Sequence, residues 1–372
     1  MPGSEPVRIA YDGVIYSSLR ECGITRFYTQ LIEHLAALNP EWLLDIHVAE
    51  VGKSLRLPQA KNVAVFSRKH LRSRVCSPIN YLRLRRAIGR TKPQIIHATL
   101  GRSFPFAQCP TVTTVYDLIQ HKVSEHYSDR RYNRARQLWE RSARCSSAVI
   151  AISETTKRDI IEIADSDPAK VLVTYPGVNR LMGPSSQSEI EGYRKRRGLH
   201  RPYILYVGAR ILHKNFPLLA KAFVSSTNLR DFDLVAVGGE EKIAEQELLA
   251  PTVRDRVHHL RSIEDEELRL IYGAATVLVF PSMYEGFGFP LVEAMACGTP
   301  VVASDIPSTR EVCGDACVLF QLGHPADCSA AILRATEPAI REQLVKRGLA
   351  RVARFTWEEC ARETKKVYES LL

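Results

Sequence analysis

Residues 277–300 read VLVFPSMYEGFGFPLVEAMACGTP, and this stretch decides the fold class of the chain. The opening apolar run, Val277–Phe280, is typical of a strand that is buried on both faces. A Gly-x-Gly turn follows, and Pro290 then stands where helices often begin. A buried strand, a glycine turn and a helix form the repeating unit of a parallel α/β sheet.

The same alternation of short apolar runs and helical patterns extends over the whole chain. In the first half the runs are Val7–Tyr11, Val63–Phe66, Ile95–His97, Thr111–Tyr116, Ala148–Ile152 and Val171–Tyr175, and in the second half Tyr203–Gly208, Leu234–Val237, Val257–Leu260 and Val301–Ala303. A Pro/Gly/Ser-rich stretch, residues 176–187, indicates a linker between the two series. We therefore predict two Rossmann-like α/β domains, residues 1–180 and 181–354, followed by a terminal amphipathic helix within 355–372. The cleft between two such domains is the expected ligand site.

The turn after Val277–Phe280 has the chemistry of an anion and sugar site. Gly286 and Gly288 leave no Cβ to obstruct a close ligand, and a helix N-terminus offers positive charge. Glu285 and Glu293 supply carboxylates, each of which can accept two hydrogen bonds from ribose hydroxyls. A single Gly-x-Gly turn is more often plain structure with surface glutamates, so only the whole string indicates a site.

A second candidate stretch, Gly208–Asn215, follows the first strand of the second domain. Arg210 and Lys214 place two cations four residues apart at a strand end. This pattern suits a diphosphate, because Arg offers a bidentate fork and Lys a point charge. Solvated basic residues of a loop are the alternative for this pair alone.

These residues carry a resemblance to the family 4 retaining glycosyltransferases, which have the two-domain GT-B fold. The matching strings are Glu285–Glu293 with Gly-Phe-Gly after the first Glu, its continuation Ala294–Pro300, Arg210–Asn215, Phe355–Trp357 and, more weakly, Ala151–Glu154 and Tyr175–Val178. The similarity covers nearly the whole chain and is most specific in residues 203–310. It implies that the terminal helix packs back on the first domain.

The resemblance implies a nucleotide-diphosphate sugar as donor and transfer with retention of configuration, without an obligatory metal or other cofactor. Arg210 and Lys214 would neutralise the leaving diphosphate, Glu285 would accept hydrogen bonds from donor-sugar hydroxyls, and Glu293 would hold the ribose. Amides of Phe287–Phe289 would meet sugar or phosphate. The donor-binding residues implied in this way are Gly23, Arg210, Lys214, Ser262, Ile263, Glu285, Gly286, Phe287, Gly288, Phe289 and Glu293; those given a catalytic role are Arg210, Lys214 and Glu285.

The chain departs from the family pattern at three places. Cys22 precedes Gly23 where many relatives have two glycines. Tyr116-Asp117 stands where a His-Asp pair is common, and tyrosine cannot act as a base near neutral pH. We keep Tyr116, Asp117 and His121 as candidates on the acceptor side, although a lone loop histidine is more often incidental. Arg261 precedes Ser262-Ile263 where the family has a glycine before its nucleobase contact.

Other patterns bear on metals and on the cellular compartment. Asp165-Ser166-Asp167 and Asp231-Phe232-Asp233 match the Asp-x-Asp of metal-dependent transferases, and turn or cap roles are the better interpretation. No His, Cys or carboxylate cluster has metal spacing. The nine cysteines are scattered, no secretory signal opens the chain and no apolar run reaches membrane-spanning length. We expect a reduced, cytoplasmic protein, peripheral on the inner face of the plasma membrane.

The formal net charge of +10 is concentrated in one region. Residues 1–150 hold 23 Lys+Arg and 11 Asp+Glu, whereas residues 151–372 hold 28 and 30. Two basic stretches that include apolar residues, 68–90 and 130–144, favour attachment to an anionic membrane surface. A solvated basic face is the alternative. Nucleic acid is not expected as a partner, because no recognisable module is present.

The function predicted from these features is transfer of a hexose to a hydroxyl of a saccharide or lipid-linked saccharide. Residues 11–17 and 23–26 look most like bacterial mannosyltransferases of surface polysaccharide assembly, which favours mannose from GDP-mannose. A UDP-sugar donor is the first alternative. A GT-B epimerase or phosphorylase is the second, and no acid/base pair for an epimerase stands out. A non-enzymatic sugar-nucleotide or nucleic-acid binder is disfavoured by the intact Arg210, Lys214, Glu285 and Glu293.

Overall fold

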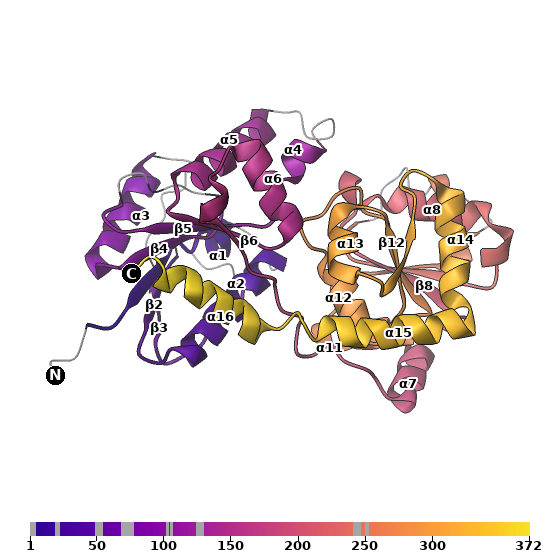
Figure 1. The fold of residues 1–372 in the computed structure, drawn as a ribbon. Coiled ribbons are helices and arrows are strands. Elements are labelled where there is room, and N and C mark those ends of the chain that lie inside the picture. The colour runs from indigo at the N-terminus through magenta and orange to yellow at the C-terminus, as the bar shows by residue number, and fades with distance from the viewer. Residues whose placement is uncertain are drawn as a thin grey trace. The chain divides into compact units, whose positions relative to one another are not determined.

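The computed structural model describes residues 5–18, 23–48, 55–67, 78–101, 104, 107–123, 130–240, 247–249 and 253–372. The chain divides into two compact units. One comprises Met1–Gly177 with Thr356–Leu372, and the other comprises Val178–Phe355. Each unit is a parallel sheet with helices on both faces, which confirms the predicted α/β class (Figure 1).

The first unit is built on a seven-stranded parallel sheet with the order β3-β2-β1-β4-β5-β6-β7. Its strands are β1 Arg8–Tyr11, β2 Leu43–Val48, β3 Val63–Ser67, β4 Ile95–Ala98, β5 Thr111–Val115, β6 Ala148–Ala151 and β7 Val171–Val173; its helices are α1 Val14–Ser18, α2 Gly23–Leu38, α3 Pro78–Thr91, α4 Ile119–Lys122, α5 Arg130–Cys145, α6 Glu154–Ala164 and α16 Trp357–Glu369, with a short 3-10 turn η2 Pro168–Lys170. α6 begins directly after Ser153, which caps the helix because its side chain accepts the Thr156 N–H at 3.0 Å.

Neighbouring residues of β1 face opposite sides of this sheet. Ala10 belongs to a core cluster with Leu84 and Ile88 of α3. Tyr11 contacts the other layer: its ring packs edge-on against Tyr28 of α2, and its hydroxyl lies 3.1 Å from that of Tyr368 on α16. Helices α2 and α16 therefore cover one face and α3 covers the other. In Figure 1 the yellow α16 lies against the indigo α2.

The terminal helix is held to the first unit by close packing at its start. Thr356 caps α16 by accepting the Glu359 N–H at 3.2 Å. The Trp357 ring packs edge-on against Phe27 of α2, with ring centroids 5.6 Å apart. A Cβ at Gly177 would lie 2.3 Å from the Trp357 nitrogen, so only glycine fits there.

The second unit is built on a six-stranded parallel sheet with the order β10-β9-β8-β11-β12-β13. Its strands are β8 Tyr203–Val207, β9 Asp233–Val237, β10 Val257–Leu260, β11 Val277–Phe280, β12 Val301–Ser304 and β13 Cys317–Phe320; its helices are α7 Gln187–Arg197, α8 Phe216–Ser225, α11 Asp265–Ala274, α12 Phe289–Ala296, α13 Pro307–Cys313, α14 Pro325–Thr336 and α15 Pro338–Val352, with 3-10 turns η3 Leu212–Lys214, η4 Thr227–Leu229 and η5 Arg254–Arg256. The strand order reverses between β8 and β11. Ligands of open α/β sheets bind outside the carboxyl ends of strands at such a switch point.

Several elements differ from the sequence-based expectation. Val14–Ser18, which is not among the apolar runs noted in the sequence, forms the short helix α1, in which Val14, Ile15 and Tyr16 are buried. Strand β2 is missed by a search for apolar runs because it contains Asp45 and His47. Both side chains are buried, and Arg8 Nη1 donates to Asp45 Oδ2 at 2.9 Å. The buried carboxylate is thus compensated by a neighbouring strand.

Within the described ranges, no helix combines the length and the apolar character needed to cross a bilayer.

Candidate active site

The candidate site lies at the carboxyl edge of the second sheet. The segment after β8 contains Arg210 and Lys214, and the segment after β11, the neighbouring strand, contains Glu285 and the glycine turn. Because carboxyl ends of parallel strands share one edge, these segments meet at the switch point. The donor-side residues predicted from the sequence, other than Gly23, all belong to this one unit.

Arg210 is buried and held by two aromatic rings. Its guanidinium carbon lies 3.7 Å from the ring centre of Phe216 and 4.8 Å from that of Tyr206. Nη2 lies 3.2 Å from Nδ1 of His259 on β10, and since arginine only donates, that nitrogen accepts. The cation is therefore fixed in orientation before any anion binds, which lowers the cost of binding a phosphate.

Gly239 makes room for the backbone of Arg210. Its φ is +72°, and a Cβ there would lie 2.6 Å from the Arg210 nitrogen. Any other residue would push the segment that contains Arg210 away from the end of β9, so this glycine also shapes the site.

Lys214 and Glu285 form an ion pair across the two strand ends. Nζ and Oε1 are 2.6 Å apart, and the side chains are only 19% and 12% exposed. Nζ also lies 5.6 Å from the ring centre of Phe280, the last residue of β11. The sequence assigned these two residues to different parts of the donor, and the structure adds that they contact each other.

His213 joins the same two segments through its backbone. The Met283 N–H donates to the His213 carbonyl at 2.7 Å. The imidazole is buried, and this burial lowers its pKa to about 4, a change opposed by Glu285 and assisted by Lys214. The imidazole of His213 is thus neutral at neutral pH. Of these two neighbouring residues, only Lys214 carries a charge.

The turn after β11 owes its shape to Gly288. This residue has a φ of +99° and stands directly before α12, and a Cβ would lie 2.8 Å from Cδ1 of Leu291. Phe287 does not face a ligand with its ring, because the side chain is 2% exposed and packs edge-on against Phe289 and Phe355. Its contribution to a ligand site is therefore limited to its backbone, in keeping with the amide role implied for residues 287–289.

Glu293 lies on α12, one turn inside the helix. Its Oε2 accepts a hydrogen bond from the Tyr272 hydroxyl of α11 at 2.8 Å. Tyr272 and His259 are site-supporting residues that the sequence did not single out. Both lie in otherwise apolar or amphipathic elements, and only the fold brings them to Glu293 and Arg210.

Ser262 follows β10 with a φ of +53°, in the left-handed region that favours glycine. Ser262 therefore occupies a position whose backbone suits glycine, directly after the departure at Arg261. Ser262 is exposed and Ile263 is half-buried, at the same edge of the sheet as the cations.

The remaining predicted site residues belong to the first unit. Gly23 is exposed at the first position of α2. Tyr116 follows β5 but is only 6% exposed, and its ring packs edge-on against Phe27 and Tyr28. It is an aromatic core residue there. Asp117 accepts the Ile119 N–H at 3.2 Å, and His121 Nε2 lies 3.0 Å from Glu140 Oε1.

The first sheet has a polar residue at its own switch point that the sequence reasoning did not use. Asp12 directly follows β1 and is fully buried. Its Oδ1 accepts the backbone N–H of Thr99, which follows β4, at 3.0 Å. The signal was an Asp-Gly pair directly after the first strand.

The two Asp-x-Asp strings have structural roles. Asp165 ends α6 in a left-handed conformation, and Asp167 caps the 3-10 turn η2 by accepting the Ala169 N–H at 2.9 Å. Asp233 differs from the expected turn role, because it begins β9 and pairs with His258 at 3.2 Å. Across the described ranges, no three His, Cys, Asp or Glu side chains gather as a set of metal ligands.

The predicted basic stretches lie in the first unit. Residues 68–77 and Cys22 fall outside the described ranges. On α3, Arg83, Arg85, Arg86 and Arg90 are exposed; on α5, Arg134, Arg141 and Arg144 are exposed. Both helices pack on the same face of the sheet, because the strand register places the residues under α3 and those under α5 on one side.

Comparison with known proteins establishes the class. Residues 22–180 match the family model described as Glycosyltransferase Family 4, and residues 190–349 match the model described as Glycosyl transferases group 1. The chain therefore belongs to the family 4 glycosyltransferases, which confirms the predicted family and the enzyme class, a hexosyltransferase.

Similar proteins agree with this assignment. O-antigen chain mannosyltransferase B of Escherichia coli is 29% identical over 268 residues, which are 70% of this chain and 70% of that protein. Sucrose-phosphate synthase from Thermosynechococcus elongatus is similar in structure, with a TM-score of 0.78, 21% identity and coverage of 98% of this chain and 99% of that chain. Anabaena Alr3699/HepE in complex with UDP has a TM-score of 0.75 at 18% identity, covering 98% of this chain and 100% of that chain. These structural similarities confirm the GT-B fold.

Proposed function

We propose that the protein transfers a hexose, with mannose from GDP-mannose as the favoured donor, to a hydroxyl of a saccharide or lipid-linked saccharide. The observation that carries the proposal is the pairing of Lys214 with Glu285 beside the stacked Arg210, at the switch point of the second sheet. The similarity to a protein named as a mannosyltransferase supports the choice of sugar.

Arg210 and Lys214 would bind the diphosphate of the donor. Negative charge grows on the β-phosphate as its bond to the sugar breaks, and two fixed cations in a shielded site stabilise that charge. Glu285 would accept hydrogen bonds from the sugar hydroxyls, and Glu293, oriented by Tyr272, would accept those of the ribose. In this scheme the two cations supply the charge stabilisation for which other transferases use a metal, so we propose that none is required.

We propose retention of anomeric configuration through attack on the face that the diphosphate leaves. The acceptor oxygen forms the new bond to the anomeric carbon, the bond from that carbon to the phosphate oxygen breaks, and the acceptor proton passes to the departing phosphate. No side chain acts as nucleophile. A sugar trapped covalently on Glu285 would contradict this scheme.

A UDP-sugar is the alternative donor, and the similarity to a protein solved with UDP favours it. The test is nucleotide release from a panel of GDP- and UDP-sugars, with and without a lipid-linked acceptor and with and without a metal chelator. NMR of the product then gives the anomeric configuration. Release of GDP from GDP-mannose, unaffected by chelator, would support the proposal, whereas no turnover with any donor would overturn it.

We also propose that the first unit attaches to an anionic membrane surface on the cytoplasmic side. The exposed arginines of α3 and α5 share one face of the sheet with two exposed leucines, Leu82 at 56% and Leu138 at 44%. Cations attract anionic lipid while apolar side chains enter the interface. Salt-sensitive cosedimentation with anionic vesicles is expected, and equal binding to neutral vesicles would contradict the proposal.

A further inference from the structure

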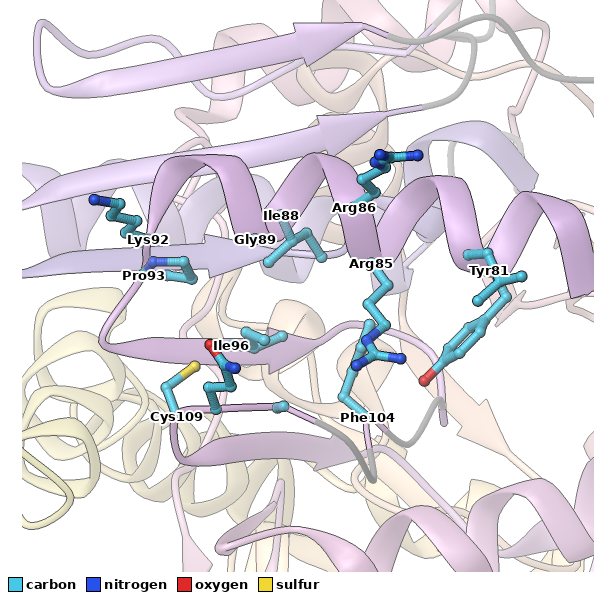
Figure 2. Close-up of a pocket in the computed structure, with 13 residues that line it drawn as sticks. Tyr81, Arg85, Arg86, Ile88, Gly89, Lys92, Pro93, Ile96, Phe104 and Cys109 are labelled. Atoms are coloured by element: carbon cyan, nitrogen blue, oxygen red, sulfur yellow. The ribbon is translucent and has the colours of Figure 1, made fainter.

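A pocket of 720 Å³ runs alongside α3 in the first unit, and none of the candidate donor-binding residues lines it. Figure 2 shows Tyr81, Arg85 and Phe104 at one end, Ile88 and Gly89 near the middle, and Lys92 at the other end. Its volume is typical of a site for a small organic molecule. We call it the α3 groove.

The floor of the α3 groove is hydrocarbon. Ile88, Ile96 and Phe104 belong to the buried core cluster under α3, so each presents only a small apolar surface, in a fixed position. The Tyr81 ring stacks on that of Phe104, with centroids 5.9 Å apart and planes at 29°. An aliphatic chain would find an apolar surface along this floor.

The charged residues that line the α3 groove are all basic. Arg85 extends toward Phe104 in Figure 2, Lys92 lies two helical turns further along the chain, and Arg86 is also among the lining residues. None of the lining residues is acidic, and residues 51–100 contain 12 basic residues and no acidic one. A ligand that suits both the floor and the charge combines a hydrocarbon chain with an anionic head.

Two residues of the α3 groove contradict their local backbone preferences. Gly89 stands inside α3, where glycine is unfavourable, and a Cβ there would meet no atom within 4 Å. Lys92 has a φ of +49°, in the region that favours glycine. Lys92 directly follows the last residue of α3, where a left-handed residue commonly ends a helix. Gly89 has no such local explanation, and any larger side chain there would extend into the open space of the groove.

We propose that the α3 groove binds one anionic phospholipid of the bilayer, with its phosphate on Arg85 and a hydrocarbon chain over Gly89, Ile88 and Phe104. Arginine holds a phosphate through two parallel hydrogen bonds, and Lys92 adds to the positive potential. This inference rests on the proposed attachment to membranes and adds a specific binding site for one lipid molecule. It does not depend on which sugar is transferred.

The first experiment fills the groove. Binding of short-chain phosphatidylglycerol, dissolved as monomers, is measured by calorimetry for the full chain and for Gly89→Phe and Gly89→Ala. We expect Gly89→Phe to bind about tenfold more weakly, as the loss of roughly two buried methylene groups would predict. Gly89→Ala is the matched control that keeps the groove open. Wild-type affinity in a folded Gly89→Phe protein would overturn the proposal.

The second experiment tests the charge with a matched pair of arginines in the first unit. Arg85→Gln should weaken binding about tenfold, as for loss of a charged hydrogen bond. Arg362→Gln removes the same charge from an exposed residue of α16, which covers the other face of the sheet, and should leave affinity within about twofold, since a distant surface charge is screened. Short-chain phosphatidylcholine should bind more weakly than phosphatidylglycerol. Equal affinity for glycerol 3-phosphate, which has no chain, would overturn the lipid assignment in favour of a plain phosphate site.

These assays contain neither sugar donor nor acceptor, so their outcome is separate from that of the transferase assay. Lipid binding that survives Gly89→Phe and Arg85→Gln would refute the groove even if GDP-mannose is turned over. Absence of turnover would refute the proposed reaction while leaving the groove results intact.

Discussion

Lys214 and Glu285 are paired at 2.6 Å across the carboxyl ends of β8 and β11, and both side chains are largely shielded from water. Each charge is neutralised by the other, so the pair holds the loop of one strand against the loop of its neighbour. A bound diphosphate would take over the role of Glu285 as partner of the lysine. The carboxylate would then be available to sugar hydroxyls at the same place.

Replacement of Lys214 by alanine should lower donor turnover about a hundredfold or more, because loss of one donor aimed at developing charge costs that much. The measurement is the rate of nucleotide release at saturating donor. Lys221→Ala is the matched control, since Lys221 is an exposed lysine on α8. An unchanged rate in a folded Lys214→Ala protein would refute the assignment of this lysine to the diphosphate.

Replacement of Arg210 by lysine should lower turnover about tenfold while keeping the positive charge, because lysine has neither the planar fork nor the stacking surface of arginine. The guanidinium lies against the rings of Phe216 and Tyr206, and an ammonium has no flat face to pack against them. Nucleotide release and donor affinity are compared with those of Arg254→Lys, an exposed residue of the same unit. Equal losses in both variants would contradict a specific role for Arg210.

Much of the candidate site was predictable because its residues lie close together in the sequence. Glu285, Gly288 and Glu293 belong to one strand–turn–helix unit, and Arg210 and Lys214 to another. Local spacing fixes such units, and the parallel sheet then brings both turns to one edge. The ion pair between Lys214 and Glu285 depends on which two strands are neighbours, which spacing alone does not specify.

Other features escaped the sequence for related reasons. Helix α7 is mostly charged and has little apolar pattern, and it is defined instead by a capping box in which Ser186 and Glu189 bond to each other's backbone N–H. Tyr116 became a candidate on the acceptor side because Tyr116-Asp117 stands where the family commonly has a His-Asp pair, and the structure adds that the rings of Phe27 and Tyr28 hold it in the core. Polar tips of aromatic residues are compatible with either environment.

Replacement of Ser262 by glycine should raise the free energy of unfolding by about 0.5 to 1 kcal/mol, because the left-handed backbone costs a residue with a Cβ more than it costs glycine. Urea unfolding gives the change. Ser188→Gly is a matched control in an exposed position of helix α7, where glycine should destabilise by a similar amount. A loss of stability in Ser262→Gly would show that the serine side chain offsets the backbone cost.

The buried His213 should make the second unit lose stability in acid. Burial lowers the pKa of His213 to about 4, whereas the ordinary value is near 6.5. Between these values the unfolded chain binds a proton that the folded chain does not, so stability is lost as pH falls from about 6.5 to 4. The full difference corresponds to about 3 kcal/mol for this residue.

Replacement of His213 by glutamine should therefore flatten the dependence of stability on pH in this range, even if the variant is less stable at every pH. The slope is the readout, because a loss of packing alone would shift the whole curve without changing its shape. Urea unfolding of the wild-type chain and the variant across this range gives both slopes, with His324→Gln as the control at an exposed position of the same unit. The backbone bond from Met283 to the His213 carbonyl does not involve the side chain, so it remains possible in the variant and the two loops can stay joined. Identical slopes in the wild-type chain and His213→Gln would mean that the imidazole is protonated in the folded state as readily as in the unfolded one, contrary to its burial.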